Sequence, residues 1–384
     1  MENRKIKRVT SKLFHKTLCA SAFAAAMIIP TTTSADQHIT GCIENGQVKA
    51  FYDQVAYSDN DYSYSLIKAY DLPVPYRKDQ PRPIRIDWTV SEPQKQVFVN
   101  VAPKRDVRHT FINDTVDGHA SGYNIWNLIP GIIYTYTIKG ADGRVLSKGS
   151  ITPTGRRRMI RLESVNNMRD LGGMPTLDGR KTKYGLIYRG GRLTKVGEGN
   201  RKNTVEQMIS AQDAKFMHDR MNIRGEIDVR WDSDLGYNDG IDGNDITSSP
   251  IGNDVTYYNI QLPQPERIEK YPHFGTALKA ILTHIRKGEA VYVHCVAGAD
   301  RTGSLCALLE ALAGVGWDQI MKDYELTTFS VYGWRHRDGW PWDHGRKWIE
   351  SRPGKTLQEK AANIFLTEGA SQQDIEEFKR LIIQ

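Results

Sequence analysis

The strongest chemical signal in the sequence is a cysteine and an arginine separated by five residues, Cys295 and Arg301. The apolar residues 290–294 before them predict a buried strand, and residues 302–315 after them predict a helix. A loop between a strand and a helix N-terminus can turn its backbone N–H groups inward, and the helix dipole adds partial positive charge. Such a loop binds an anion, and its positive field favours the reactive thiolate of a cysteine at its base.

The residues of this loop match what the hydrolysis of a phosphate ester requires. A thiolate beneath a bound phosphate is a nucleophile in line with phosphorus, and an arginine fork can hold two phosphoryl oxygens. Gly298 permits a tight backbone path, and Thr302 can donate its hydroxyl toward Cys295 when the sulfur leaves. The alternative is a buried structural cysteine, which would not need these neighbours. The residues expected to surround the phosphate are Val296, Ala297, Gly298, Ala299, Asp300 and Arg301.

The loop, His-Cys-x-x-Gly-x-Asp-Arg-Thr-Gly, resembles that of the Cys-based protein tyrosine phosphatase superfamily, in a bacterial branch of secreted tyrosine phosphatases with phosphoinositide activity. Four flanking segments resemble signatures of the same branch: 167–173 (NMRDLGG), 188–193 (YRGGRL), 227–230 (IDVR) and 323–326 (DYEL). The resemblance spans about residues 160–384. It implies two-step hydrolysis through a cysteinyl-phosphate at Cys295, with Arg301 stabilising the transition state and with no metal or other cofactor.

The resemblance also implies an aspartate that protonates the leaving oxygen. In this branch the loop aspartate is the usual acid, which favours Asp300 here. Two alternatives remain. One is a mobile loop after the strand that ends at Asp228, and its acidic residues are Asp232, Asp234 and Asp239. The other is Asp343, in a Trp-Pro-Trp-Asp segment that lies after the cysteine rather than before it.

Several residues near these motifs are expected to support the loop rather than to react. His294 is interpreted as an orienting neighbour of the cysteine, and Asp228 as part of a strand end. Arg169 and Asp170 either orient the loop from below or form a structural salt bridge. Ala299 stands where the branch often has a lysine, and the missing charge makes a phosphoinositide substrate less favoured.

The segment 331–348 holds four tryptophans and several basic residues. Together, arginine and tryptophan side chains could stack on an aromatic phosphorylated substrate and hold it. The equal alternative is a surface insertion whose tryptophans pack on the domain.

Three regions are expected: a signal peptide (1–35), an all-β sandwich domain (36–155) and a phosphatase-like catalytic domain (156–384). The sandwich is predicted by short alternating strands with regular turn signals. Its Leu128-x-Pro130-x-x-x-Tyr134 pattern resembles the tyrosine corner of fibronectin type III-like domains, in which the hydroxyl bonds to the backbone. In the third region helical and strand patterns alternate, which predicts an α/β domain with a central, mostly parallel sheet flanked by helices. The sandwich is interpreted as a spacer or docking platform for an unknown partner.

The chain has 384 residues and a formal net charge of +7, which by itself suggests an anionic partner. The first 35 residues explain most of that charge, because a basic start, a short apolar run and a small-residue site describe a cleavable signal peptide. Without them 46 basic and 44 acidic residues remain, a net charge of +2. We therefore expect an exported protein, periplasmic or secreted, with no nucleic-acid partner and no membrane anchor.

Three cysteines then remain, an odd and sparse set that is not a disulfide framework. The leading hypothesis is a tyrosine phosphatase acting on phosphoproteins or small phosphomonoesters. A phosphoinositide or inositol-phosphate phosphatase with the same chemistry is the first alternative. A catalytically inactive phosphate-binding or adhesion module is the second.

Overall fold

The computed structural model describes residues 36–54, 67, 79–90, 94–104, 112–196, 205–230, 246–270 and 272–384, all within one compact unit of the chain. The predicted signal peptide, residues 1–35, lies outside the described residues and stays a prediction. No helix in the described ranges has the length and the apolar character that crossing a bilayer would require.

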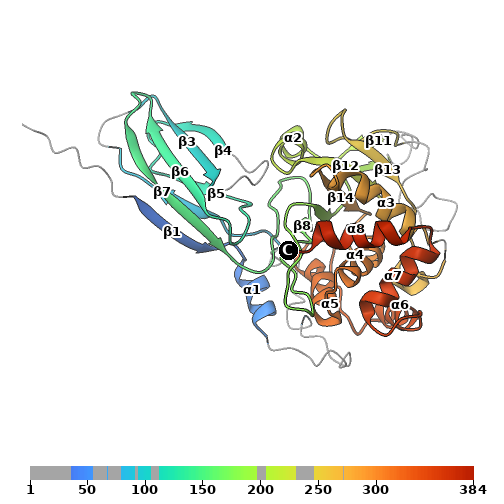
Figure 1. Ribbon diagram of the computed structural model, residues 1–384. Coiled ribbons are helices and arrows are strands. Elements are labelled where there is room, and N and C mark those ends of the chain that lie inside the picture. The colour runs from blue at the N-terminus through green and yellow to red at the C-terminus, as the bar shows by residue number, and fades with distance from the viewer. Residues whose placement is uncertain are drawn as a thin grey trace, which may run out of the picture. The chain divides into compact units, whose positions relative to one another are not determined.

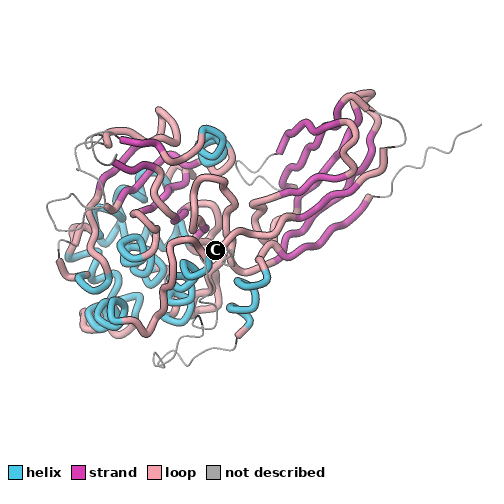
Figure 2. The backbone as a smooth tube through the Cα atoms, turned by 180° about the vertical axis from the view of Figure 1, so that it is seen from behind, coloured by secondary structure: helices cyan, strands magenta, loops and turns pink. Residues whose placement is uncertain are grey.

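Strands without an intervening helix make up the described part of residues 84–154, here called the β-region (Figure 2). Five strands form one sheet, in the order β1 (Gln37–Cys42), β7 (Val145–Thr154), β6 (Tyr134–Gly140), β3 (Gln96–Pro103) and β4 (Ile112–Asp117). A second sheet pairs β2 (Ile84–Asp87) with β5 (Gly122–Ile125) in antiparallel register. Alternate side chains are buried along β2, β3 and β6, because successive residues of a strand point to opposite faces. Both sheets contribute these side chains to one apolar core.

The turn before β6 contains the hydrogen bond that the tyrosine-corner pattern predicts. Tyr134 is fully buried, and its hydroxyl accepts the backbone N–H of Ile129 at 3.0 Å. This confirms the hydroxyl-to-backbone bond. The fibronectin type III-like assignment and the domain boundaries at 36 and 155 stay predictions.

The C-terminal region contains a five-stranded sheet with the order β13-β12-β14-β9-β8. Four strands run parallel, namely β9 (Ile187–Gly190), β12 (Ile223–Asp228), β13 (Thr256–Asn259) and β14 (Ala290–His294), and the short β8 (Arg169–Asp170) is antiparallel to β9. The predicted mostly parallel sheet is therefore present. A separate short ribbon pairs β10 (Thr194–Val196) with β11 (Val205–Gln207).

Helices pack on both faces of this sheet (Figure 1). On β14, Val291 and Val293 join a large core with helices from the C-terminal half, whereas Tyr292 joins a smaller core with α2 (Ala211–Asp219). The helices of the larger core are α3 (Phe274–Ile285), α4 (Asp300–Leu312), α5 (Trp317–Glu325), α6 (Trp340–Glu350), α7 (Leu357–Thr367) and α8 (Gln372–Ile382). The central strand β14 is thus buried on both faces, which fixes the position of the loop that follows it.

Helix α4 begins at Asp300, two residues before the predicted start at Thr302. Its first turn therefore includes the arginine of the motif, so the loop is shorter than the sequence pattern suggested.

A helix that the sequence did not predict, α1 (Gly46–Asp53), contacts the C-terminal region. Asn45 caps it by accepting the N–H of Val48. Its Phe51 and Tyr52 are buried in a small cluster with Leu326 and Phe329. The chain before the β-region is therefore packed against the region that carries the motif.

Candidate active site

The Cys-x5-Arg loop lies between the carboxyl end of β14 and the N-terminus of α4, as the sequence predicts. Cys295 is only 2% exposed, so a reacting group must enter the loop to reach its sulfur. Gly298 has a φ of 65°, in the left-handed region. A Cβ there would lie 1.9 Å from the carbonyl oxygen of Gly190. Any other residue would displace the loop from strand β9.

The carbonyl groups of four successive loop residues are held from outside the loop. Arg189 donates to the carbonyl oxygens of Gly298 and Ala299 at 2.8 and 3.0 Å. The side-chain amide of Asn167 donates to Ala297 at 2.9 Å, and the backbone N–H of Arg192 donates to the carbonyl of residue 296 at 3.0 Å. The C=O and N–H of a trans peptide point in opposite directions, so outward carbonyls direct the following N–H groups inward. This arrangement builds the anion site that the spacing predicts.

Two residues complete the loop at the start of α4. Arg301 is buried at 6% exposure. The hydroxyl of Thr302 is buried and forms no hydrogen bond within the part of the chain that the structure describes. The bond from Thr302 to Cys295 is therefore not formed in this geometry, and the hydroxyl's role in the release of sulfur stays a prediction.

Asp300 is bound on both carboxylate oxygens. Arg335 donates to one oxygen at 2.8 Å and to the other at 2.9 Å, and the Tyr324 hydroxyl donates to the first at 3.0 Å. Burial, and then the neighbouring Asp300 carboxylate, raise the pKa of Tyr324 well above its usual value, so this hydroxyl stays a donor. In this geometry Asp300 is an acceptor of hydrogen bonds from protein donors.

A second carboxyl lies near this pair. Glu266 belongs to the short helix η5 (Pro265–Arg267), and its Oε2 is buried with no hydrogen-bond partner among the described residues. Burial, and more weakly the charge of Asp300, raise the pKa of Glu266. Sequence reasoning missed Glu266, because a lone glutamate in a proline-flanked turn carries no pattern.

Beneath the loop, three arginines converge on one carboxylate. Arg157, Arg169 and Arg189 donate to Asp323 at 2.5, 3.0 and 2.8 Å. Burial alone would raise the pKa of Asp323, but these arginines outweigh it and hold the pKa well below its usual range. Arg189 connects this cluster directly to the loop carbonyls. The sequence left open whether Arg169 orients the loop from below or forms a structural salt bridge. It did not predict that Arg189 and Asp323 pair with each other, although both lie in segments that carry the resemblance.

The other predicted supporting residues, His294, Asp170 and Asp228, each have side-chain partners of their own. His294 contacts Glu226 at 2.9 Å and the backbone oxygen of Cys295 at 3.2 Å, which fits an orienting role. Asp170 pairs with Arg158 at 2.9 Å and accepts two backbone N–H groups, which makes it part of a structural salt bridge.

Asp228 forms a closed ion pair at the end of β12. Both its oxygens accept from Arg230, and the Tyr257 hydroxyl donates to it at 2.9 Å. Burial would raise the pKa of Asp228, but Arg230 outweighs it and lowers the pKa to about 2. The acidic residues of the alternative mobile loop, Asp232, Asp234 and Asp239, lie outside the described residues.

Within the segment 331–348, one tryptophan packs on the domain as an insertion would, and two others are exposed as a substrate-contacting surface would be. Trp342 is buried and packs edge-on against Tyr324, 5.3 Å between ring centroids, as a structural insertion would. Trp334 and Trp340 are 40% and 67% exposed, as a substrate-contacting surface requires. Asp343 is half exposed on α6 and pairs with a lysine one turn along, at 2.7 Å.

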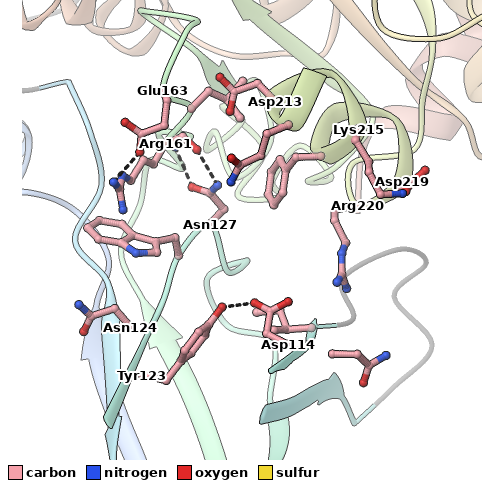
Figure 3. A pocket seen from close by; sticks show the side chains of 16 residues that line it. Asp114, Tyr123, Asn124, Asn127, Arg161, Glu163, Asp213, Lys215, Asp219 and Arg220 are labelled. Carbon is pink, nitrogen blue, oxygen red and sulfur yellow. Dashed lines mark hydrogen bonds and ion pairs between the residues drawn. The ribbon is translucent and has the colours of Figure 1, made fainter. Parts of the chain in front are cut away.

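A cavity of about 880 Å³ lies away from the loop, between the β-region and α2 (Figure 3). Its walls include Tyr123, which donates to Asp114, and Arg161, whose guanidinium lies over the Trp126 ring. No residue of the Cys-x5-Arg loop lines it. Among the residues described, no group of three or more His, Cys, Asp or Glu side chains is arranged to hold a metal ion.

Comparison with known proteins identifies the class that this loop and sheet define. The model of the tyrosine phosphatase family matches residues 160–363, more than half of the chain. The chain therefore belongs to the tyrosine phosphatase family. This confirms the predicted enzyme class, a Cys-dependent phosphatase of the protein-tyrosine-phosphatase type.

Two curated relatives match parts of the chain. A candidate tyrosine-protein phosphatase of Cupriavidus necator is 22% identical over 184 residues, 44% of this chain and 62% of that protein. The triple specificity protein phosphatase PtpB of Mycobacterium tuberculosis is 35% identical over 101 residues, 24% of this chain and 34% of that protein. The chain thus spans less than two thirds of the length of either relative.

Solved structures with some similarity include PTPMT1 in complex with PI(5)P, with 12% identity, 48% of this chain and 94% of that chain covered, and a TM-score of 0.28. TpbA of P. aeruginosa has 14% identity, 48% and 91% coverage, and the same TM-score of 0.28. Scores this low carry no weight for the site.

Proposed function

We propose that this protein is an exported phosphatase that hydrolyses phosphomonoesters, phosphotyrosine above all, through a cysteinyl-phosphate on Cys295. The observation that carries the proposal is that the carbonyls of four successive loop residues, directly after a buried cysteine, accept hydrogen bonds from outside the loop, which directs the following N–H groups inward. Anion binding and a nucleophile therefore coincide at one place. Export rests on the sequence pattern of residues 1–35.

The reaction follows from these positions in two displacements. The Cys295 thiolate attacks phosphorus, an S–P bond forms, and the bond from phosphorus to the ester oxygen breaks. That oxygen leaves as an alcohol or phenol after it takes a proton. Water then attacks phosphorus and gives a proton back to the carboxylate that protonated the leaving oxygen, and the S–P bond breaks to release inorganic phosphate and restore the thiolate. Arg301 and the loop N–H groups stabilise the three equatorial oxygens in both steps.

We assign the proton for the leaving oxygen to Asp300. Both its oxygens accept from Arg335, so this role requires the ion pair to open when substrate binds. Glu266 is the runner-up, because burial favours its protonated form and because its Oε2 has no partner within the described residues. An acid must carry its proton at the working pH, and a raised pKa serves that need.

Phosphotyrosine is preferred over phosphoinositides for two reasons. Ala299 supplies no positive charge at the place where a lysine would bind a polyanionic headgroup. Trp334 presents an exposed ring that lies 4.5 Å, between ring centroids, from that of His336, and such a pair of rings suits an aromatic ester. One relative is named a triple specificity phosphatase, which is a reason to measure more than one substrate class.

The test is the hydrolysis of an aryl phosphate such as p-nitrophenyl phosphate by the chain from residue 36 onward, with a metal chelator present. We expect turnover by the wild type and at least a thousand-fold loss in Cys295→Ser, since the nucleophile is gone. Cys42→Ser, in β1, is the matched control and should keep wild-type kcat/KM. An inactive wild type would contradict the mechanism and favour the phosphate-binding module, whereas an active Cys295→Ser would contradict the assignment of Cys295 as the nucleophile.

The same assay separates the two acids. The variant of the true acid, Asp300→Asn or Glu266→Gln, should lose the alkaline fall of the pH–rate profile, and the other should keep it. Comparing a phosphotyrosine peptide with phosphoinositide vesicles tests the substrate preference, and a higher kcat/KM on the vesicles would reverse it.

A further inference from the structure

One residue from the chain before the β-region contacts a residue that holds the loop of the candidate active site. Asp79 accepts the backbone N–H of Asn167 at 2.8 Å. The next residue, Gln80, is fixed on two sides: Asn45 donates to its carbonyl at 2.9 Å, and its own amide donates to the carbonyl of Leu162 at 3.2 Å. The residue that follows Asp79 is thus held by contacts with both the N-terminal and the C-terminal parts of the chain.

Asn167 is the residue through which this contact reaches the loop. Its φ is 59°, a left-handed conformation that non-glycine residues rarely adopt. Its side-chain amide donates to Ala297 in the loop at 2.9 Å and to the Thr327 hydroxyl at 3.1 Å. Its side-chain oxygen accepts from Arg169 at 2.7 Å. Every polar group of this asparagine side chain is therefore engaged, and its backbone conformation determines where they point.

We propose that Asp79 is a positioning residue for the catalytic loop: by binding the N–H of Asn167 it holds the left-handed conformation that places the Asn167 amide on Ala297. The inference rests on the proposed function only in taking this loop as the phosphate site. A hydrogen bond to a charged acceptor is stronger than a neutral one, which suits a residue that holds a strained conformation. Burial raises the pKa of Asp79, and the Asn167 N–H opposes this shift.

The alternative to this positioning role is a purely structural role for Asp79. In that case Asp79 only connects the N-terminal segment to the C-terminal region. Its removal would then lower thermal stability, while the folded protein would bind phosphate as before. The positioning role instead predicts weaker phosphate binding by protein that is still folded.

The decisive measurement is the binding of inorganic phosphate to the whole protein by titration calorimetry, together with the melting temperature of each variant. We expect Asp79→Ala to weaken phosphate binding about ten-fold, since a donor at a strained position loses its charged partner. Asp79→Asn keeps an acceptor oxygen and should remain within about two-fold of the wild type. Asp87→Ala removes an exposed carboxylate on the nearby strand β2 and should change nothing.

Each possible outcome of these measurements either supports the positioning role or overturns it. Unchanged phosphate affinity in Asp79→Ala, equal losses in Asp79→Ala and Asp79→Asn, or no phosphate binding by the wild type would each overturn the inference. If Asp79→Ala does not fold, Asn167→Gly tests the next link, because glycine keeps the backbone conformation and removes only the amide. It should show the same ten-fold loss, and unchanged binding would again overturn the inference. A wild type that binds phosphate but hydrolyses no ester would contradict the proposed function alone.

Discussion

The base of the catalytic loop and the core of the β-region are stabilised in opposite ways. Beneath the loop, fully buried charges meet, with three arginines around Asp323. The β-region is held by an apolar core, and ion pairs that the structure describes there, such as Arg85–Asp87, lie at the surface. Buried ion pairs are costly to desolvate and seldom add net stability over an apolar core, whereas apolar burial stabilises directly.

The difference indicates what each region needs. An apolar core tolerates small shifts of its side chains, but a loop that must direct four successive N–H groups at one anion does not. Charged hydrogen bonds have fixed directions, and Arg189 transmits the position of Asp323 to Gly298 and Ala299. We therefore expect changes beneath the loop to lower stability and activity together, and changes in the β-region to lower stability alone.

The largest effect is expected for Asp323→Asn. It leaves three buried guanidinium groups without their shared negative charge, and breaking a buried pair in this way costs about 3–5 kcal/mol. Urea unfolding measures this loss, and kcat/KM on an aryl phosphate should fall as well, because Arg189 no longer fixes the loop. Asp178→Asn, an exposed partner of Arg180, is the control and should change neither quantity appreciably. Full activity in Asp323→Asn would break the proposed link between the cluster and the loop.

A smaller effect is expected for Ile138→Ala in the middle of β6, where the side chain is fully buried. Removing three methylene-sized groups from a packed core costs about 2–4 kcal/mol. At a temperature where the variant stays folded, kcat/KM should equal that of the wild type, because the loop receives its support elsewhere. A fall in kcat/KM without unfolding would show that the β-region acts on the site, and the contrast between the two regions would then fail.

The sequence predicts contacts between residues that are close along the chain, and it does not predict contacts between residues that are far apart along the chain. The loop and its strand-to-helix setting are local patterns, and the sequence predicts them at Cys295 and Arg301. The partners of the loop are not local: Arg189 meets Asp323 across 134 positions, and Asp79 meets Asn167 across 88. Spacing carries no information on such pairs. A charged residue inside a buried strand, such as Arg189, is nevertheless a signal, because it requires a partner.

The smallest expected effect concerns Glu310, which shows how the buried charges beneath the loop respond to pH. This residue of α4 is 3% exposed, and its carboxyl oxygens have no hydrogen-bond partner within the part of the chain described. Burial, and then the nearby Asp323 charge, raise its pKa well above the usual value, although Arg157, Arg189 and Arg169 oppose the shift. The folded protein therefore keeps the proton at a pH where the unfolded chain, with a pKa of about 4.3, has released it.

Because the folded state binds more protons, Glu310 makes the free energy of unfolding decrease as pH rises from about 4.3 toward the raised pKa of this carboxyl in the folded protein. Glutamine cannot ionise, so Glu310→Gln should remove that part of the slope. We measure the free energy of unfolding of both proteins with urea between pH 5 and pH 8. The value for the variant minus the value for the wild type should increase as the pH rises. Glu359→Gln, at the exposed start of α7, is the control and should run parallel to the wild type over this range. A variant curve parallel to the wild type would mean that Glu310 is ionised within the cluster. The base of the loop would then hold a second buried negative charge, and its contrast with the apolar β-region would be sharper still.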